Sequence, residues 1–240
     1  MASGEAHAVT DRPIRDPYRD RTSLEFRFRA RRFAKVQALI EDALAEHGKA
    51  RILDLGGTET YWLIGEDFLR ENRDRLEITL VNLQQEAVED PELFRSVAGD
   101  ATDPHLFAGD EFDLVHSNSV IEHVGGSAQM VRFASNVKRL SKRYYVQTPN
   151  YWFPYEPHFR FPGFQYLPEK LRIALIRRFP LGFFERVEDL QEARQIIAHH
   201  SLISTRQMRR LFDDAEISHE RAFGLNKSII AFRRGRADTA

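Results

Sequence analysis

The chain has no cysteine among its 240 residues, and this absence removes several kinds of chemistry. Disulfides, zinc–thiolate centres and thiol nucleophiles all require cysteine. An excess of charge of either sign is missing too, since 35 Lys and Arg stand against 36 Asp and Glu. A formal net charge of −1 gives no global reason to expect nucleic acid or an acidic surface as a partner.

Long apolar runs are also missing. No uninterrupted apolar stretch approaches the roughly 20 residues that span a bilayer, and Met1-Ala2-Ser3-Gly4-Glu5 opens without the apolar core of a signal peptide. Zero cysteine is compatible with the cytoplasm. We therefore expect a cytoplasmic protein without stable membrane insertion, built as one domain or as one domain with a lid.

The chain divides into five segments by composition and pattern. Residues 1–24 are polar and rich in Arg and Asp, which predicts a flexible arm. Residues 25–149 alternate strand and helix patterns and are expected to form a ligand-binding core. Residues 150–203 are aromatic, then helical, and predict a lid. Residues 204–234 complete the core with a helix and a hairpin, and 235–240 form a tail.

The expected strands and helices follow from apolar spacing and turn residues. Strands are predicted at 50–55, 76–83, 97–99, 112–117 and 143–147, the last broken by Pro149, and hairpin strands at 217–223 and 227–233. Helices are predicted at 26–47, 64–72, 90–95, 129–142, 168–178, 187–199 and 205–213. The alternation from 50 to 150 indicates an α/β fold with a parallel sheet covered by helices on both faces. The final pair of strands forms an antiparallel hairpin.

The first strand ends in an acid followed by two glycines, Asp54-Leu55-Gly56-Gly57. This pattern indicates a buried strand running into a tight turn, where glycine lets the backbone approach a ligand closely. The Asp54 carboxylate is then expected near a cationic amino group of that ligand, directly or through water. The alternative is an aspartate that only initiates the turn.

Polar residues also end the next two strands. In nucleotide-binding α/β folds, the position of Asn82 commonly carries an acid for the ribose hydroxyls. Asn can still serve a hydroxyl, although without the benefit of charge. Asp100 is expected to accept from an exocyclic adenine amine while the backbone of Ala101 reads the ring edge. The alternative role of Asp100 is a cap for the helix that follows.

These segments lead on to Phe112-Asp113-Leu114-Val115 and Ile121-Glu122-His123-Val124. The ordered set resembles a class I S-adenosylmethionine-dependent methyltransferase of the small-molecule "type 11" group. The resemblance implies a Rossmann-like, mostly parallel seven-stranded sheet, S-adenosylmethionine as cofactor and methyl transfer to a nucleophile. It also implies a set of cofactor-binding residues: Asp54, Gly56, Gly57, Thr58, Asn82, Leu83, Asp100, Ala101 and Asn118.

Two positions depart from the family pattern. Thr58 replaces the second glycine of a glycine-x-glycine turn, and threonine disfavours positive φ, while Asn82 replaces the usual acid. Both departures favour an alternative, a non-catalytic binding or scaffold protein that keeps the fold. A third alternative, an NAD-dependent oxidoreductase, lacks the G-x-G-x-x-G fingerprint.

The methyl acceptor is expected to meet residues on two loops. Glu156 and His158 lie among prolines and aromatics after the fifth strand, which suits a shifted pKa and an apolar or sugar-like acceptor. We predict His158 as general base, oriented by Glu156, with His123 as a further catalytic candidate. The alternative is that these residues only pin the lid to the sheet. The acceptor is predicted to be a small molecule or glycan intermediate, methylated at oxygen.

Glu122-His123 also resembles the end of a Glu-x-x-Glu-His metal motif found in some quinone-ring methyltransferases. The first position of that motif is here Ser119, so a divalent site lacks one carboxylate. We therefore expect no bound metal.

Overall fold

A seven-stranded sheet forms the centre of the molecule in the computed structural model, which describes residues 18–109 and 111–235. The strands follow the order β3-β2-β1-β4-β5-β9-β8. Their bounds are β1 Ala50–Leu55, β2 Leu76–Asn82, β3 Phe94–Ala98, β4 Leu114–Asn118, β5 Tyr144–Pro149, β8 Glu216–Ala222 and β9 Leu225–Arg233. Strands β1 to β5 are parallel to one another, whereas β9 runs antiparallel to β5 and to β8. The predicted Rossmann-like α/β fold is confirmed.

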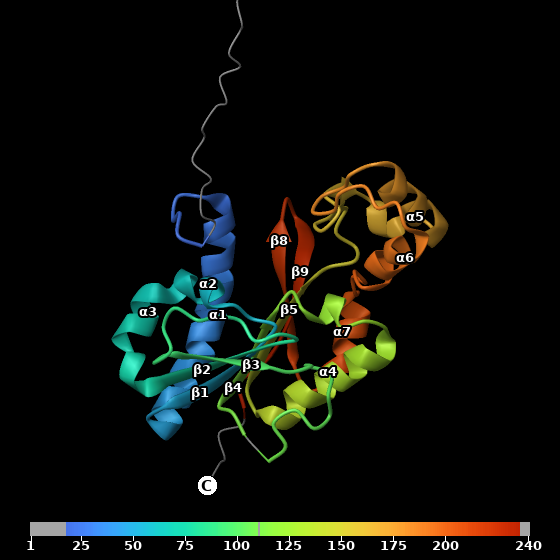
Figure 1. Ribbon diagram of the computed structural model, residues 1–240. Coiled ribbons are helices and arrows are strands. Elements are labelled where there is room, and N and C mark those ends of the chain that lie inside the picture. Colours follow the sequence, from blue (N-terminus) through green and yellow to red (C-terminus); the bar gives the residue numbers. More distant parts are fainter. Residues whose placement is uncertain (1–17, 110, 236–240) are drawn as a thin grey trace, which may run out of the picture.

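Helices cover both faces of this sheet (Figure 1). On one face lie α1 (Leu24–His47), α2 (Glu59–Trp62) and α3 (Glu66–Glu71), and on the other lie α4 (Ser127–Leu140) and α7 (Thr205–Leu211). Each layer has its own apolar cluster against the sheet, one built around α1 and the other around α4 and α7. Right-handed crossovers then bring the carboxyl ends of the parallel strands to one common edge.

Local signals set the limits of the longest helix. The side chain of Ser23 accepts from the backbone N–H of Phe26 at the start of α1. Gly48 ends the helix with φ +73 and returns its N–H to the carbonyl of Leu44. Four short 3₁₀ segments lie elsewhere: η1 Leu63–Gly65, η2 Arg73–Arg75, η3 Ile121–His123 and η4 Phe164–Tyr166.

Three of the expected elements are wrong in detail. The predicted helix 90–95 is a turn that leads into β3, because Phe94 pairs with Ile78 of β2 and the pairing extends the backbone. The predicted helix 64–72 is broken into η1 and α3. Pro149 does not break β5, since it is the last residue of that strand and lies opposite Ser228 of β9.

Residues 150–203 form a small cluster of their own beyond β5. It contains β6 (Tyr155–Glu156), β7 (Phe161–Pro162), α5 (Glu169–Arg178) and α6 (Leu190–Ala198). Phe159 and Phe164 stack at its centre with ring centroids 4.2 Å apart. Figure 1 shows α5 and α6 together, away from α1 and α3. Whether this segment moves as a lid stays a prediction.

Two other expectations concern the chain ends and the surface. Residues 1–17 of the predicted arm and 236–240 of the predicted tail lie outside the described residues.

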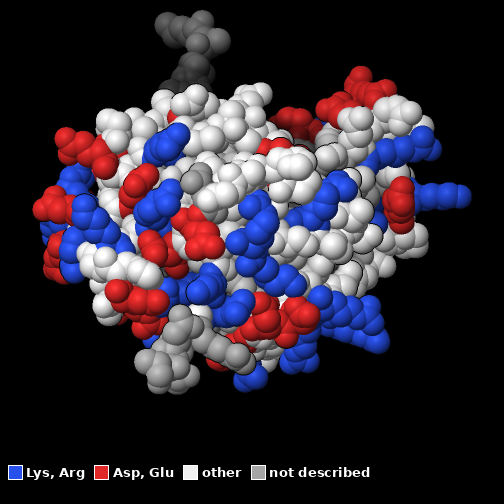
Figure 2. Space-filling model, turned by 90° about the horizontal axis from the view of Figure 1, so that it is seen from below, with Lys and Arg blue, Asp and Glu red and all other residues white. Residues whose placement is uncertain are grey.

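Within 18–109 and 111–235, every helix is either too short or too polar to cross a bilayer. Figure 2 shows basic and acidic side chains interspersed on the face seen from below.

Candidate functional site

The Gly56-Gly57 turn lies at the carboxyl edge of the sheet, directly after β1. Gly56 has φ +72, and a Cβ there would lie 2.5 Å from Cγ2 of Val120. A Cβ on Gly57 would lie 1.8 Å from Oδ2 of Asp54. The turn therefore needs glycine at both positions, for backbone conformation at the first and for space at both.

Asp54 is fully buried beneath this turn. Its Oδ2 accepts from Nε1–H of Trp62 at 2.9 Å, and its Oδ1 lies 2.7 Å from Nδ1 of His116. The His116 Nε2 in turn lies 3.2 Å from the hydroxyl of Tyr61. Both carboxylate oxygens thus have partners inside the protein. These partners hold the carboxylate under the turn, and its expected contact with a ligand, directly or through water, stays a prediction.

Thr58 does not take the backbone conformation that made it a concern. It has φ −129 and ψ 151, an extended conformation that any residue adopts, and it forms the N-cap position of α2. Its side chain is exposed at the carboxyl edge. The replacement of glycine by threonine therefore brings no backbone strain here.

The remaining predicted cofactor residues end neighbouring strands. Nδ2 of Asn82 donates a hydrogen bond to the carbonyl of Gly57 at 2.9 Å, and this bond connects the end of β2 to the turn. Leu83 beside it is 79% exposed. Asp100 accepts from the backbone N–H of Thr102 at 2.7 Å, which closes a local turn, and its neighbour Ala101 is half-buried. The alternative role of Asp100 as a helix cap is wrong, because the residues that follow it form turns and no helix.

The end of central β4 carries two unusual polar residues. Asn118, another predicted cofactor residue, has a buried Oδ1 that finds no hydrogen-bond partner among residues 18–109 and 111–235. Ser119 follows with φ +58, a left-handed conformation that is uncommon for residues other than glycine and asparagine. Its hydroxyl donates to Oε1 of Gln147 on β5 at 3.0 Å. Strained residues of this kind concentrate at functional sites.

The predicted catalytic residues do meet, although they come from different segments. Oε1 of the buried Glu156 lies 2.7 Å from Nδ1 of His158, and its Oε2 accepts from the backbone of Phe159. The rings of His158 and His123 lie edge to face with centroids 4.7 Å apart. Nδ1 of His123 lies 3.1 Å from the carbonyl of His199. The geometry joins the loop after β4 to the 150–203 segment.

Glu122 lies against this cluster and is completely buried. Its Oε2 accepts from Oγ1 of Thr148 at 2.9 Å. Burial raises the pKa of Glu122 to about 7, because the charged form loses its hydration. Burial, with repulsion from His158 and His200, lowers the pKa of His123 to about 4. Glu122, His123 and His158 have the donor atoms to hold a metal ion.

Several residues of the site escaped sequence reasoning. Trp62 and His116 complete the network of Asp54, and Thr148 and His200 border the histidine cluster. The available signal was His116, which directly follows apolar Leu114 and Val115 in β4, because a buried polar group needs a partner.

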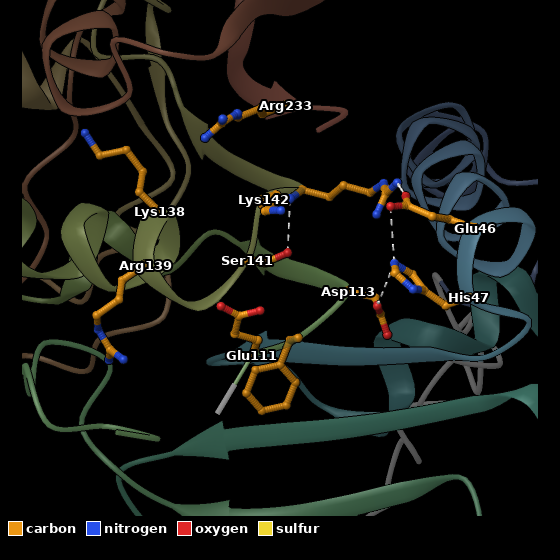
Figure 3. Close-up of a pocket in the computed structure, with 11 residues that line it drawn as sticks. Glu46, His47, Glu111, Asp113, Lys138, Arg139, Ser141, Lys142 and Arg233 are labelled. Carbon is orange, nitrogen blue, oxygen red and sulfur yellow. Dashed lines mark hydrogen bonds and ion pairs between the residues drawn. The ribbon is translucent and has the colours of Figure 1, made fainter. Parts of the chain in front are cut away.

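The pocket in Figure 3 lies at the opposite, amino edge of the sheet. It measures about 350 Å³ and lies between the end of α1 and the residues before β4 and β5. Three of the basic residues that line it have acidic partners: Arg143 pairs with Glu46, Lys138 with Asp213 at 2.9 Å, and Arg233 with Asp214 at 2.7 Å. We therefore place the candidate site at the carboxyl edge.

Sequence comparisons with known proteins give a short match to two relatives. No family model matches the chain. Uncharacterized proteins Rv1509 and MT1557, from two strains of Mycobacterium tuberculosis, are each 43% identical over 53 residues. That stretch is 22% of this chain and 18% of each relative, so the match spans less than a fifth of their length.

Solved structures resemble the chain more widely but weakly. An O-methyltransferase family protein from Burkholderia thailandensis is 14% identical with a TM-score of 0.47, over 87% of this chain and 58% of that one. The plantazolicin methyltransferase BpumL, in complex with a monoazolic desmethylPZN analog and SAH, is 10% identical with a TM-score of 0.49, over 87% of this chain and 85% of that one. A putative Zn-dependent alcohol dehydrogenase from Rhodobacter sphaeroides is 13% identical with a TM-score of 0.48, over 78% and 84%. Likeness at this level carries no argument about activity.

Proposed function

We propose that the chain is an S-adenosylmethionine-dependent methyltransferase that methylates an oxygen atom of a small molecule or glycan intermediate. The observation that carries the proposal is the sheet order, in which antiparallel β9 enters between β5 and β8. The class I methyltransferases that the motifs resemble have a seven-stranded sheet with an antiparallel final strand. The glycine turn lies where such enzymes hold the methionine end of the cofactor.

The donor set at the carboxyl edge fits this cofactor by its chemistry. Gly56, Gly57 and Thr58 offer backbone groups to the methionine end, and exposed Leu83 offers an apolar surface next to Asn82. The buried, unpartnered Oδ1 of Asn118 suits a donor group on a ligand. The cofactor supplies the activated methyl group, and the protein supplies orientation and exclusion of water.

His158 is the residue we assign to proton removal from an acceptor hydroxyl. Glu156 fixes the proton on Nδ1, which leaves Nε2 as the acceptor atom. Glu156 is therefore a positioning residue. A cytoplasmic location belongs to the same proposal and is supported by the absence of cysteine.

Calorimetry with S-adenosylmethionine and S-adenosylhomocysteine tests the cofactor. We expect binding in the micromolar to low millimolar range, weakened in Asn118→Ala and Asp100→Ala but unchanged in Asp74→Asn, an exposed residue of η2 before the amino end of β2. Absence of binding contradicts the enzyme and favours a non-catalytic protein. Competition between a nicotinamide cofactor and S-adenosylhomocysteine would instead favour an oxidoreductase.

The acceptor side needs a separate measurement. S-adenosylhomocysteine release is followed against a panel of hydroxylated small molecules and glycans, and the best acceptor is then used across a pH series. We expect His158→Ala to lower the rate about 10²- to 10⁴-fold, and Glu156→Gln to shift the pH profile. An unchanged rate and profile in His158→Ala removes His158 from the chemistry.

A further inference from the structure

Three side chains at the carboxyl edge bring metal-ligating atoms together. Glu122 and His123 lie in η3 after β4, and His158 follows β6 in the 150–203 segment. One ligand atom from each residue lies within 4.8 Å of the other two. Two imidazole nitrogens and one carboxylate oxygen are a ligand set that suits divalent transition metals.

The carboxylate of Glu122 gives an independent sign that a cation belongs here. Its side chain has no exposed surface, and Oε2 is satisfied by Thr148. Oε1 is also buried and has no hydrogen-bond partner within the described residues. A buried carboxylate oxygen without a partner is costly, and a bound cation removes that cost.

The two histidines are already in the form that binds a metal. Nδ1 of His123 faces the backbone carbonyl of His199, and Nδ1 of His158 faces Oε1 of Glu156. Because both of these partners accept hydrogen bonds, each Nδ1 carries the proton and each Nε2 keeps its lone pair. Carbonyl and carboxylate groups behind the ring are the usual outer partners of metal-binding histidines.

A third imidazole lies next to the two histidine ligands. The ring of His200 lies 4.8 Å from that of His123 and 5.0 Å from that of His158. Nδ1 of His200 lies 2.7 Å from the backbone carbonyl of Ile196, which fixes the orientation of this ring.

We propose that Oε1 of Glu122 and the Nε2 atoms of His123 and His158 bind one divalent transition-metal ion. This reverses the expectation drawn from Ser119, because the missing ligand comes from the 150–203 segment and not from the local motif. Two nitrogen ligands favour Zn²⁺, Mn²⁺ or Co²⁺ over Mg²⁺ and Ca²⁺, which prefer oxygen. Three protein ligands leave coordination positions open for water or an acceptor oxygen.

Such an ion would also join the 150–203 segment to the sheet, since its ligands come from both. It would change the role of His158, because a lone pair bound to a metal cannot take a proton. His158 would then be a ligand in the metal-loaded protein, and its role in proton removal would apply to the metal-free protein. The ion itself would supply Lewis-acid chemistry, which lowers the pKa of a bound oxygen ligand.

Calorimetric titration of the chelator-treated, untagged full chain with Zn²⁺ or Mn²⁺ tests the site. We expect one equivalent to bind, with Mg²⁺ weaker. Glu122→Gln and His158→Gln should each weaken binding more than about 100-fold, and Glu156→Gln about 10- to 100-fold, because Glu156 only orients the ligand. His219→Gln is the matched control: His219 is a partly buried histidine whose Nε2 contacts Thr205, outside the cluster.

Thermal unfolding provides a second readout. Metal should raise the midpoint of the wild type but not that of Glu122→Gln, a variant expected to fold because it removes a buried charge. Equal affinity in wild type, Glu122→Gln and His158→Gln would overturn the site, as would absence of binding by both metals. Neither measurement involves S-adenosylmethionine, so failure of the metal site and failure of the proposed function are separable.

Discussion

Trp62 donates a hydrogen bond from Nε1 to Oδ2 of Asp54 at 2.9 Å, underneath the glycine turn that follows β1. The other oxygen of Asp54 meets Nδ1 of His116 on β4. Three elements, β1, α2 and β4, therefore meet at one buried carboxylate. The acid of the most prominent motif in the chain acts on the turn from below, as a positioning residue.

Asp54→Asn should destabilise the fold. An amide has one acceptor oxygen, so the variant places an NH₂ group against either Trp62 or His116, both of which donate. We expect the free energy of unfolding to fall by about 2–4 kcal/mol, measured by urea denaturation. The exposed Asp74→Asn is the control and should stay within about 0.5 kcal/mol of wild type. Wild-type stability in Asp54→Asn would contradict the network.

Gly57→Ala should disturb the turn through its side chain. The new Cβ would lie 1.8 Å from Oδ2 of Asp54, so the carboxylate or the turn must move. We expect a loss of about 1–3 kcal/mol in unfolding free energy, together with weaker S-adenosylmethionine binding in calorimetry. Gly126→Ala is the control, because the nearest atom to its Cβ is 3.5 Å away, and it should cost less than about 1 kcal/mol. Equal effects of the two variants would refute the steric argument.

Glu122→Gln should stabilise the metal-free protein at high pH. The folded pKa of about 7 exceeds the ordinary value of 4.5. Between these values the folded chain keeps a proton that the unfolded chain releases, so this group's contribution to stability falls as pH rises. The difference corresponds to about 3 kcal/mol above pH 7. The surrounding groups are Thr148, His123, Glu156 and His158.

Urea denaturation of the wild type and Glu122→Gln with chelator present checks this prediction. We expect the variant to be more stable by up to about 3 kcal/mol near pH 8 and nearly equal near pH 4. Gln can still accept from Thr148, so the hydrogen bond is retained. A stability difference that is the same at both pH values would rule out titration of Glu122 as its cause.

Phe223→Asn should stabilise the β8–β9 hairpin. Phe223 and Gly224 form its two-residue loop, both with positive φ, and the Phe223 side chain is 99% exposed. Asn tolerates this conformation much better than Phe and favours such turns. We expect a gain of about 0.5–1 kcal/mol in unfolding free energy. Phe223→Ala lacks the Asn preference and should gain less; a larger gain for Ala would contradict the turn argument.

Sequence patterns predicted the elements whose signals are local. The bounds of β1 followed from an apolar run ended by glycine, and the final hairpin from two apolar runs around Gly224. The predicted helix 90–95 failed because β3 lies at the sheet edge, where pairing of Phe94 with Ile78 decides the backbone. Phe94 and Ile78 are 16 positions apart in the chain, so a local stretch of sequence does not reveal that they pair.

The sequence by itself determined the alternation of strands and helices, and with it the edge at which Asp54, Asn82 and Asp100 gather. Only the tertiary structure decided what these groups touch: Asp54 meets Trp62, and Asn82 meets Gly57. In the same way His158 comes to lie beside Glu122. The reason is physical. Hydrophobic periodicity is a property of residues that are close in the sequence. Hydrogen bonds and metal ligation depend instead on distances between side chains, and these distances are set by tertiary packing.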